Sequence, residues 1–359
     1  MDNNCVMDIQ RRLDLFPKLP DMLAELRRLL AQLAPGQVAT CGQIATALGD
    51  RKAARWVGFW LKNHRHTPDC SCHRVIYAGG LLGGSSGFTP QEQARQLAAE
   101  GVPLQGGIVA IDQLAPVHFA SSHPLVALQE FQDQVSAHTH LARPRGRPRW
   151  IAGLDLSYGR KAGSQPDGET WAIAALVMVD ARSGKTVATH MVRHLVTFPY
   201  ITSYLSFREI PAMLAAIEAA EQAGDRAETI LVDGAGILHP RRAGIAAMLG
   251  AVSGYPTIGV AKSHLCGSYD EALLAAERIA PVEWAGELSG VAMLTRQTSP
   301  KPLFVSPGNR HSVGSAAVIV RGLLSTDYLP TPVAIADRLS RQLARAEEKS
   351  QDSADPLDE

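Results

Sequence analysis

The 359-residue chain carries no excess of charge of either sign and has few cysteines and aromatic residues. Lysine and arginine together number 35, as do aspartate and glutamate, so net charge alone predicts no nucleic-acid partner. The prediction of a nucleic-acid partner instead rests on local basic patches, for example Arg143, Arg145, Arg147 and Arg149. The sequence shows no signal peptide, membrane-length apolar run or internal repeat, and its five cysteines form no disulfide framework. We therefore expect a monomeric, cytoplasmic protein with no membrane partner.

The length of the chain predicts two domains. We place the first in residues 1–105 and a linker in residues 106–124, where loops and short strands mix. The second domain takes residues 125–345 and opens with a helix at 125–138. The remaining residues, 346–359, are polar and acidic, so we expect them to be disordered.

Two apolar segments in the second half of the chain end in charged residues. Residues 228–233 predict a short strand that ends at Asp233, where glycines stop it. Residues 257–261 predict a second strand that delivers Lys262 at its end. Because ligands of open α/β sheets collect beyond the carboxyl ends of strands, we expect Lys262 to neighbour Asp233.

A histidine and two arginines follow the glycine-rich turn after Asp233. His239, Arg241 and Arg242 precede residues 243–249, whose apolar spacing predicts a helix. The start of a helix binds anions readily, because backbone N–H groups and the helix dipole face them there. This segment therefore suits a phosphate group.

Two further carboxylates interrupt apolar segments. Asp155 lies within the predicted strand 150–158, and Glu209 lies on an early turn of the apolar helix at 204–211. Burying either charge requires a partner such as a cation or hydrogen bonds. Each acid alone is more often a cap or a salt-bridge partner, but three such acids can share one Mg²⁺ ion.

At these residues the chain resembles the endonuclease V family over about residues 125–341. The shared motifs are Gly153-Leu-Asp155-Leu-Ser-Tyr158, Phe198-Pro-Tyr200, Tyr204-Leu-Ser-Phe-Arg-Glu209, Asp233-Gly, His239-Pro-Arg-Arg, Ile258-Gly-Val-Ala-Lys262-Ser and Val305-Ser-Pro-Gly308. The resemblance implies an α/β, RNase H-like mixed sheet with flanking helices. It also implies nicking of DNA at the second phosphodiester 3′ to deoxyinosine, although inosine in RNA stays an open alternative.

The resemblance also assigns roles to single residues. Asp155, Glu209 and Asp233 would bind Mg²⁺, for which Mn²⁺ can substitute, and Asp337 falls where the family places a histidine or aspartate near the metal. The residues that would assist at the phosphate are Lys262 and His239. Tyr200, flanked by Pro199, matches the aromatic wedge that fills the gap left by an opened base pair. Packing within a strand is the alternative role for this tyrosine.

Five positions depart from the family pattern. Ala235 stands in place of a histidine or glutamine, and Thr202-Ser203 stands in place of Pro-Gly after the wedge. Asn309 replaces a histidine, and Ala334 replaces an arginine. None of these changes removes an expected metal ligand.

The first hundred residues predict a different unit. Apolar spacing predicts helices at 22–33, 41–48 and 52–63, which is a helix-turn-helix arrangement. The last helix alternates a basic edge with an apolar one. The basic edge, which suits phosphates, comprises Lys52, Arg55 and Lys62, and the apolar edge, expected in the core, comprises Trp56, Phe59 and Trp60.

Histidines and cysteines cluster directly after this helix. They are His64, His66, Cys70, Cys72 and His73. The pattern fits a metal cluster or one activated cysteine beside a histidine. Structural zinc sites usually have two to four residues between paired cysteines, and only one separates these, so we favour the activated cysteine. A buried, inert thiol is the remaining alternative.

Residues 20–101 resemble the DNA-binding domain of O6-alkylguanine-DNA alkyltransferases and alkyltransferase-like proteins. The matching motifs are Gly36-Gln-Val-Ala-Thr40, Lys52-Ala-Ala-Arg55 and Ser71-Cys72-His73-Arg74-Val75-Ile76. The resemblance implies a small winged-helix domain that binds DNA, with Arg74, beside the reactive centre, as one of the residues that contact the DNA. In it Arg55 would fill the place of a flipped guanine, Cys72 would accept the alkyl group, and His73 with Glu100 would activate the thiol.

This domain also departs from its family. Ser71 replaces a proline, Cys41 replaces a tyrosine and His64-Arg65 replaces an Asn-Pro hinge. Alkyltransferase-like proteins carry tryptophan where this chain keeps Cys72, which favours transfer of the alkyl group. The sequence thus predicts a bifunctional DNA-repair enzyme acting on deoxyinosine and O6-alkylguanine. The alternative is a non-catalytic protein that marks damaged DNA and recruits other repair enzymes.

Overall fold

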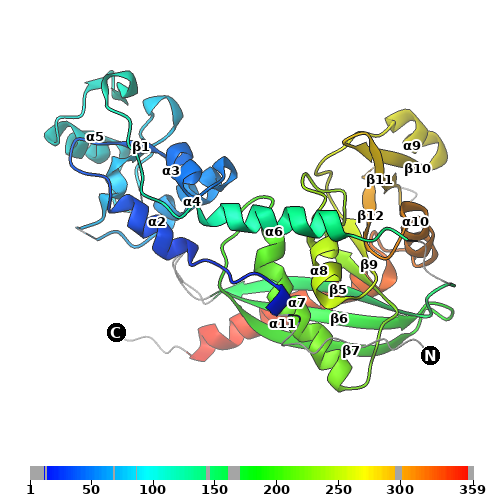
Figure 1. Ribbon diagram of the computed structural model, residues 1–359. Coiled ribbons are helices and arrows are strands. Elements are labelled where there is room, and N and C mark those ends of the chain that lie inside the picture. The colour runs from blue at the N-terminus through cyan, green and yellow to red at the C-terminus, as the bar shows by residue number, and fades with distance from the viewer. Residues whose placement is uncertain are drawn as a thin grey trace.

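A computed structural model describes most of the chain. The described residues are 12, 14–67, 69–85, 87–142, 146–160, 170–295 and 301–354. Arg143 and Arg145 of the predicted basic patch lie outside these ranges. Within them, no helix combines the length and apolar character needed to cross a membrane. Figure 1 shows a smaller, mostly helical lobe and a larger lobe built on a sheet, with helix α6 running between them.

The smaller lobe is a helix-turn-helix unit with short strands, as predicted. Its helices are α2 (Met22–Leu30), α3 (Cys41–Ala47), α4 (Ala54–Asn63) and α5 (Pro90–Ala99), and 3-10 turns lie at Arg51–Ala53 and Ser71–Arg74. Strand β1 (Ala39–Thr40) pairs in parallel with β2 (Val75–Ile76), and β3 (Leu104–Gln105) pairs with β4 (Ile108–Val109). Helix α3 begins where it does because Thr40 and Gln43 form a capping box.

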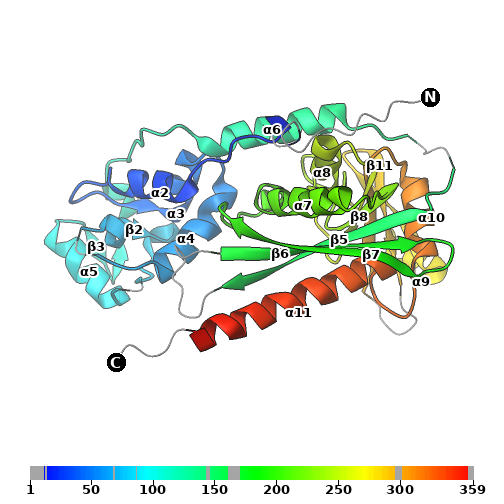
Figure 2. The same ribbon diagram turned by 90° about the horizontal axis from the view of Figure 1, so that it is seen from below.

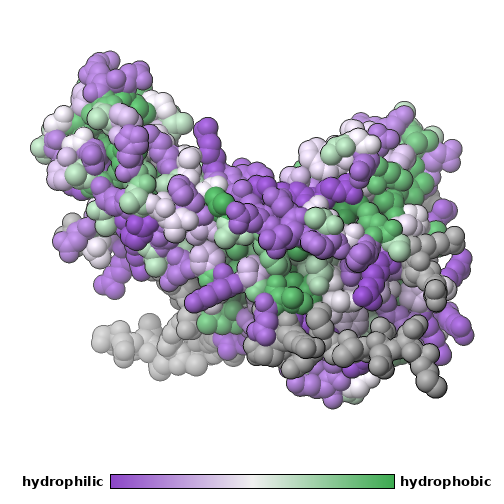
Figure 3. Space-filling model, viewed as in Figure 1, coloured by the Kyte–Doolittle hydropathy of each residue, from purple (hydrophilic) through white to green (hydrophobic). Residues whose placement is uncertain are grey.

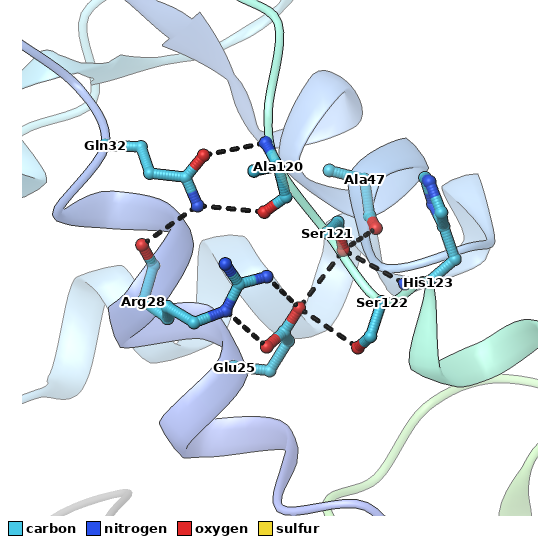
Figure 4. A network of polar contacts seen from close by, with 8 residues as sticks. All are labelled: Glu25, Arg28, Gln32, Ala47, Ala120, Ser121, Ser122 and His123. Atoms are coloured by element: carbon cyan, nitrogen blue, oxygen red, sulfur yellow. Dashed lines mark hydrogen bonds and ion pairs between the residues drawn. The ribbon is translucent and has the colours of Figure 1, made fainter.

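The chain between the lobes is fastened to the smaller one (Figure 4). The Gln32 amide group bonds both backbone groups of Ala120, with distances of 3.0 and 2.8 Å. The Ser121 hydroxyl donates to the Ala47 carbonyl at 2.5 Å and to Glu25 at 3.1 Å. Residues 120–123 therefore hold α6 at a fixed place beside α2 and α3.

Helix α6 (Pro124–His138) confirms the helix expected at 125–138 and connects both lobes. The Leu125 backbone N–H donates to the Leu48 carbonyl at 2.9 Å. The Gln129 side chain donates both to the Gly49 carbonyl at 3.1 Å and to the Tyr204 hydroxyl at 2.7 Å. Hydrophilic side chains cover the outer side of α6, and the molecular face is hollowed between the lobes that rise beside it (Figure 3).

The larger lobe contains one mixed eight-stranded sheet. Its strands are β5 (Trp150–Arg160), β6 (Thr170–Asp180), β7 (Thr186–Val196), β8 (Thr229–Asp233), β9 (Thr257–Ala261), β10 (Ile279–Trp284), β11 (Glu287–Met293) and β12 (Leu303–Asn309). They lie in the order β10-β11-β12-β9-β8-β5-β6-β7. β5, β8 and β9 run parallel, and the other neighbours are antiparallel. This architecture confirms the predicted mixed sheet.

Helices cover both faces of the sheet (Figure 2). Helices α6, α7 (Leu205–Gln222) and α8 (Ile245–Ser253) lie on one face, and α11 (Thr331–Ala354) lies on the other. Helices α9 (Glu271–Glu277) and α10 (Val313–Gly322) complete the lobe. Because α11 continues to Ala354, residues 346–354 are helical and not disordered as predicted; residues 355–359 lie outside the described ranges.

Glycine at position 153 lets α11 approach the sheet. A Cβ atom placed on Gly153 would lie 2.2 Å from the backbone carbonyl carbon of Pro332. Both atoms of that clash belong to rigid elements, so no flexible side chain can relieve it. The first turn of α11, and with it the position of Asp337 one turn later, depends on this contact.

We predict that Gly153→Ala lowers the free energy of unfolding by about 1–3 kcal/mol, because it overpacks the contact between β5 and α11. Urea-induced unfolding measures this change. The matched control is Gly314→Ala in α10, where an added Cβ would meet nothing within 4 Å. The free energy of unfolding of that variant should be unchanged or rise by up to about 1 kcal/mol, since alanine favours helix more than glycine. Equal stabilities of the two variants would contradict the prediction.

Candidate metal centre and DNA-facing sites

The predicted pairing of Asp233 with Lys262 is confirmed. Parallel pairing of β8 with β9 sets Asp233 opposite Val260, so both strands end at the same edge of the sheet. The Lys262 Nζ atom lies 2.5 Å from Asp233 Oδ2 and 3.0 Å from Asp337 Oδ1. Burial alone would lower the pKa of Lys262, but Asp233 and Asp337 raise it above its ordinary value. The amine is therefore a permanent cation at this edge.

Three carboxylates converge at the amine. One oxygen each from Asp155, Asp233 and Asp337 lies within 4.8 Å of the others. Burial, followed by the charge of Asp233, raises the pKa of Asp155 to about 8. Such crowding of hard oxygen donors is costly without a cation, and oxygen ligands are those that Mg²⁺ prefers. These residues therefore fit a divalent metal ion.

Glu209 lies beside this group but is not part of it. Its carboxylate on α7 accepts a hydrogen bond from the Tyr158 hydroxyl at 2.7 Å. Burial raises the pKa of Glu209 to about 7, and the nearby charge of Asp233 also raises it. The closest acid set is thus Asp155, Asp233 and Asp337, whereas the sequence placed Glu209 in the first trio and Asp337 at its margin.

His239 lies in a turn before α8 and not at the helix start as predicted, since α8 begins at Ile245. The imidazole is buried, and its Nδ1 atom accepts from the Arg241 backbone N–H at 3.2 Å. Burial and then the charges of Lys52 and Arg241 lower the pKa of His239 to about 4. The histidine is therefore neutral near pH 7, and it experiences the charge of a lysine from the other lobe.

Tyr200 is exposed, which excludes strand packing as its role. Its side chain is 58% accessible and lies on residues 197–204, which we call the wedge loop, between β7 and α7. The loop forms one wall of a cavity of about 240 Å³ whose other wall is α4. The cavity is lined by Lys52, Arg55, Trp56, Phe59, Thr170, Pro199, Tyr200, Thr202 and Arg208.

Helix α4 differs from its predicted arrangement at one apolar position. Trp56 and Trp60 are buried as expected, but Phe59 is 47% exposed and faces the cavity. Of the basic residues, Lys52 donates to the Ser203 hydroxyl at 3.2 Å, and Lys62 lies over the Tyr77 ring at 5.7 Å. Both lysines and Arg55 are exposed.

Arg74, which we predict to contact DNA, is half-buried and paired with Glu100. Its guanidinium donates to both carboxylate oxygens of Glu100, at 2.7 to 3.1 Å, and to the Leu33 carbonyl at 2.7 Å. Arg74, followed by His73, lowers the pKa of Glu100 to about 2. These bonds occupy the arginine, so it anchors the loop that carries Cys72.

The imidazole beside Cys72 is not the one that the sequence indicated. His73 does pair with Glu100, at 2.8 Å, but the nitrogen at the Cys72 sulfur is His66 Nδ1, at 3.2 Å. Hydrogen bonding to Cys72 lowers the pKa of Cys70, and the neighbouring Cys70 raises the pKa of Cys72. Cys70 is therefore the more acidic thiol of the two.

Sequence reasoning missed three arginines on α11. Arg338, Arg341 and Arg345 line a cavity of about 560 Å³ together with Lys262 and Asp337. Their spacing of three and four residues on a helix was the signal, because it places them on one face. They give a positively charged approach to the acid group, which suits a phosphate backbone.

Two departures from the family pattern have a structural explanation. The Asn309 amide donates to the carbonyls of Gly250 and Tyr255, at 3.1 Å each, and so holds the end of α8. Ser203 adopts φ 71°, a conformation that favours glycine, and its hydroxyl accepts from Lys52. Nothing in the structure explains Ala235, and Ala334 lines the cavity beneath the arginines.

Comparisons agree with both lobes. Residues 129–338 match the family model described as Endonuclease V, and residues 22–102 match the one described as 6-O-methylguanine DNA methyltransferase, DNA binding domain. A relative from Picrophilus torridus, named "Bifunctional methyltransferase/endonuclease", is 31% identical over 317 residues, which are 88% of this chain and 94% of that protein. The fold, the acid group and these matches define a DNA-repair protein with a nuclease lobe and a methyltransferase-type DNA-binding lobe.

Nuclease relatives make the identification specific. An Endonuclease V from Azotobacter vinelandii is 40% identical over 194 residues, 54% of this chain and 83% of that protein. The crystal structure of Endonuclease V from Streptomyces avermitilis has 30% identity and a TM-score of 0.53, covering 64% of this chain and 95% of that one. The chain belongs to the endonuclease V family.

We predict that Mg²⁺ stabilises the protein more at about pH 8.5 than at about pH 6. The folded-state pKa of Asp155, one of the three acids, is raised to about 8, so protons compete with metal for this ligand below that value. Without metal, raised carboxylate pKa values lower stability as pH rises from about 4 to about 8. Thermal unfolding with Mg²⁺ or with chelator measures the shift in Tm. The Asp233→Asn variant should lose this shift; a wild-type shift that is equal at both pH values would contradict the assignment.

Proposed function

We propose that the nuclease lobe nicks DNA at the second phosphodiester 3′ to deoxyinosine, with Mg²⁺ as cofactor and Mn²⁺ as a substitute. The observation that carries this proposal is the convergence of three carboxylates and Lys262 at one edge of the sheet. A Ciona intestinalis Endonuclease V, similar in fold with a TM-score of 0.56, was crystallised with DNA containing inosine. That substrate supports the choice of lesion.

Each residue of the site has a chemical task in this proposal. Asp155, Asp233 and Asp337 would hold the metal, which supplies positive charge at the scissile phosphate and activates water. The Lys262 amine, now between two carboxylates, offsets the negative charge that builds on the phosphate. His239 is neutral and its Nδ1 atom accepts from the Arg241 backbone N–H, so its Nε2–H group can donate one hydrogen bond to a phosphate oxygen without adding charge.

The wedge loop and α11 would position the strand. Tyr200 and Pro199 project from the loop that leads into α7, the helix that carries Glu209. An exposed aromatic ring here suits insertion between bases, which exposes a base otherwise hidden in the stack. Arg338, Arg341 and Arg345 would bind the phosphates that lead to the acid group.

We also propose that the smaller lobe transfers the alkyl group of O6-alkylguanine in DNA to Cys72. The Picrophilus torridus relative, matched over nearly its whole length, carries both activities in its name. In this step the Cys72 sulfur bonds the alkyl carbon, the bond from that carbon to O6 breaks, and the guanine takes up a proton. His66 Nδ1, at 3.2 Å, is the base placed to take the thiol proton. The thioether product makes the reaction single-use.

We predict that Asp233→Ala lowers the nicking rate by more than about 100-fold, the upper range for losing a residue that merely supports a metal ligand. Binding to DNA with one deoxyinosine should persist, because the wedge loop and arginines are unchanged. The assay follows cleavage of a labelled oligonucleotide with Mg²⁺ or chelator. Asp225→Ala, which removes an acid paired with His190 elsewhere on the lobe, is the control and should cleave like wild type. Equal cleavage by Asp233→Ala would reject the metal assignment.

We predict that Cys72→Ala abolishes the gain of one methyl mass after incubation with O6-methylguanine DNA, while deoxyinosine nicking continues. Intact-protein mass spectrometry reads the transfer. A methyl group found on the variant would name another acceptor, and Cys70, 3.4 Å from His64 Nε2, is the first thiol to examine. Tight lesion binding with neither a nick nor a mass gain in the wild type would instead support the damage-sensing alternative.

We predict that Arg345→Ala weakens DNA binding to a similar degree with and without deoxyinosine, because phosphate contacts carry no sequence information. The slope of log affinity against log salt concentration should fall by about one. Fluorescence anisotropy over a salt series measures both quantities. An effect confined to deoxyinosine DNA would show that Arg345 reads the lesion and not the backbone.

A further inference from the structure

Four potential metal ligands meet at the end of α4, outside the acid group. They are His64, His66, Cys70 and Cys72, and one ligand atom of each lies within 4.8 Å of all the others. The His66 Nδ1 to Cys72 Sγ distance is 3.2 Å, and the His64 Nε2 to Cys70 Sγ distance is 3.4 Å. Tetrahedral zinc with ordinary bond lengths separates nitrogen and sulfur ligands by roughly 3.5 Å. The two measured nitrogen–sulfur distances are thus close to those of a tetrahedral zinc site.

His64 is oriented as a metal ligand would be. Its Nδ1 atom bonds the Leu61 carbonyl at 3.0 Å, which leaves Nε2 with its lone pair directed at the cysteines. The imidazole also stacks on Trp60, with ring centroids 4.1 Å apart, and is almost fully buried. Metal-bound histidines commonly have this second bond to a carbonyl, because it fixes the ring and its tautomer.

The chain also makes room for His66. A Cβ atom on Gly87 would lie 2.5 Å from the Cβ atom of His66, so glycine lets this loop close over the histidine. Phe88 packs edge-on against the same ring, with centroids 5.4 Å apart. Cys72 is held from the other side by the 3-10 turn Ser71–Arg74, whose Arg74 is anchored at Glu100. Separate elements thus position the ligands independently.

We propose that His64, His66, Cys70 and Cys72 bind one zinc ion in the smaller lobe. Two thiolates with two imidazoles in tetrahedral array are a donor set that selects zinc. The single residue between the cysteines argued against zinc in the sequence, but that argument treats the cysteines as one local pair. Here His64, the C-cap of α4, pairs with Cys70, and His66 pairs with Cys72, so each cysteine at the 3-10 turn meets a different histidine. This site is separate from the nuclease acid group, but it includes Cys72 and His66, the thiol and the base of the proposed alkyl transfer, so bound zinc would compete with that reaction for both residues.

The test measures zinc in the purified full-length protein by mass spectrometry of the metal. We expect one zinc per chain in the wild type and a drop of at least tenfold in both Cys70→Ser and His64→Gln. Cys41→Ser removes a buried cysteine of the same lobe that is not in the group, and should keep its zinc. Asp155→Asn should also keep it, which separates this site from the acid group.

Cobalt substitution gives a second readout that does not depend on yield. Co²⁺ bound by cysteine thiolates absorbs in the near ultraviolet, so the wild type should show this band and Cys70→Ser should lose it. Circular dichroism reports whether each variant is folded, and deoxyinosine nicking adds the same check for the variants in the smaller lobe. A wild type that takes up no zinc on reconstitution, or folded variants that hold as much zinc as the wild type, would overturn the proposal.

The cavity between α4 and the wedge loop carries a second, independent inference. Its walls come from both lobes, and two exposed aromatic rings, Phe59 and Tyr200, line it. Cationic groups of Lys52, Arg55 and Arg208 also line it. Aromatic faces with surrounding cations are how proteins bind unstacked nucleotides. At about 240 Å³ the cavity is smaller than pockets for whole small-molecule ligands, which suits a single base.

We infer that this cavity holds one nucleotide of the DNA strand bound by the nuclease lobe, so that both lobes grip the same strand. The inference rests on the proposed nuclease function, but binding in chelator tests it without cleavage. Phe59→Ala should weaken binding of deoxyinosine DNA by roughly 5-fold to 100-fold, the range for losing one base-aromatic stack. Leu81→Ala removes an exposed apolar side chain of the same lobe outside the cavity and should bind like wild type.

Cleavage kinetics distinguish the two proposals. With Mg²⁺, Phe59→Ala should raise KM for nicking and leave kcat unchanged, because the ring lines this cavity and belongs to neither the acid group nor the cavity beside it. Wild-type affinity and KM in Phe59→Ala would overturn the shared-strand inference and leave the nuclease proposal intact. Absence of nicking in the wild type would reject the nuclease proposal. The binding data in chelator would still show whether the cavity holds a nucleotide.

Discussion

Concentrated negative charge at one edge of the sheet is the constraint on which the nuclease lobe depends. Asp155 comes from β5, Asp233 from β8 and Asp337 from α11. Two strands of the sheet and a helix that covers one of its faces must therefore meet at this edge. Repulsion among these acids opposes the arrangement, as the raised pKa of Asp155 shows. Packing supplies the opposing force, for α11 can reach the site only because Gly153 lets it lie against β5. Lys262 lowers the remaining repulsion and shares its charge between two of the acids.

The two lobes are also joined by contacts that a flexible tether would not make. Tyr204 on the wedge loop donates to the Asp50 carboxylate of the helix-turn-helix unit at 2.7 Å, and Lys52 reaches Ser203. The apolar core is continuous across α6, where Phe131 packs against both Phe16 and Phe207. Helix α4 is thereby fixed beside the wedge loop, and this geometry is compatible with the proposal that both lobes engage one strand.

Local sequence patterns predicted the elements well and the long-range contacts less well. Strand ends and apolar periodicity located Asp233, Lys262 and α6, because each signal lies within a few residues. Asp337 and the α11 arginines joined the site through the packing of a distant helix, which periodicity does not encode. The sequence did not indicate His66 at the Cys72 sulfur for the same reason: His73 pairs with Glu100 as predicted, but folding of the loop after α4 brings His66 to within 3.2 Å of the sulfur.

Ser203 shows how the fusion of two lobes can explain a departure from a family pattern. Its left-handed backbone, φ 71°, would suit the glycine usual at that position and costs a serine about 1–2 kcal/mol. The hydroxyl gains a charge-assisted hydrogen bond from Lys52, which a glycine cannot form. That lysine also lies close enough to lower the pKa of buried His239. Ser203 on the wedge loop therefore contacts the lysine that also influences His239 of the nuclease lobe. The contact between the two lobes thus gives a structural reason for a serine at this position.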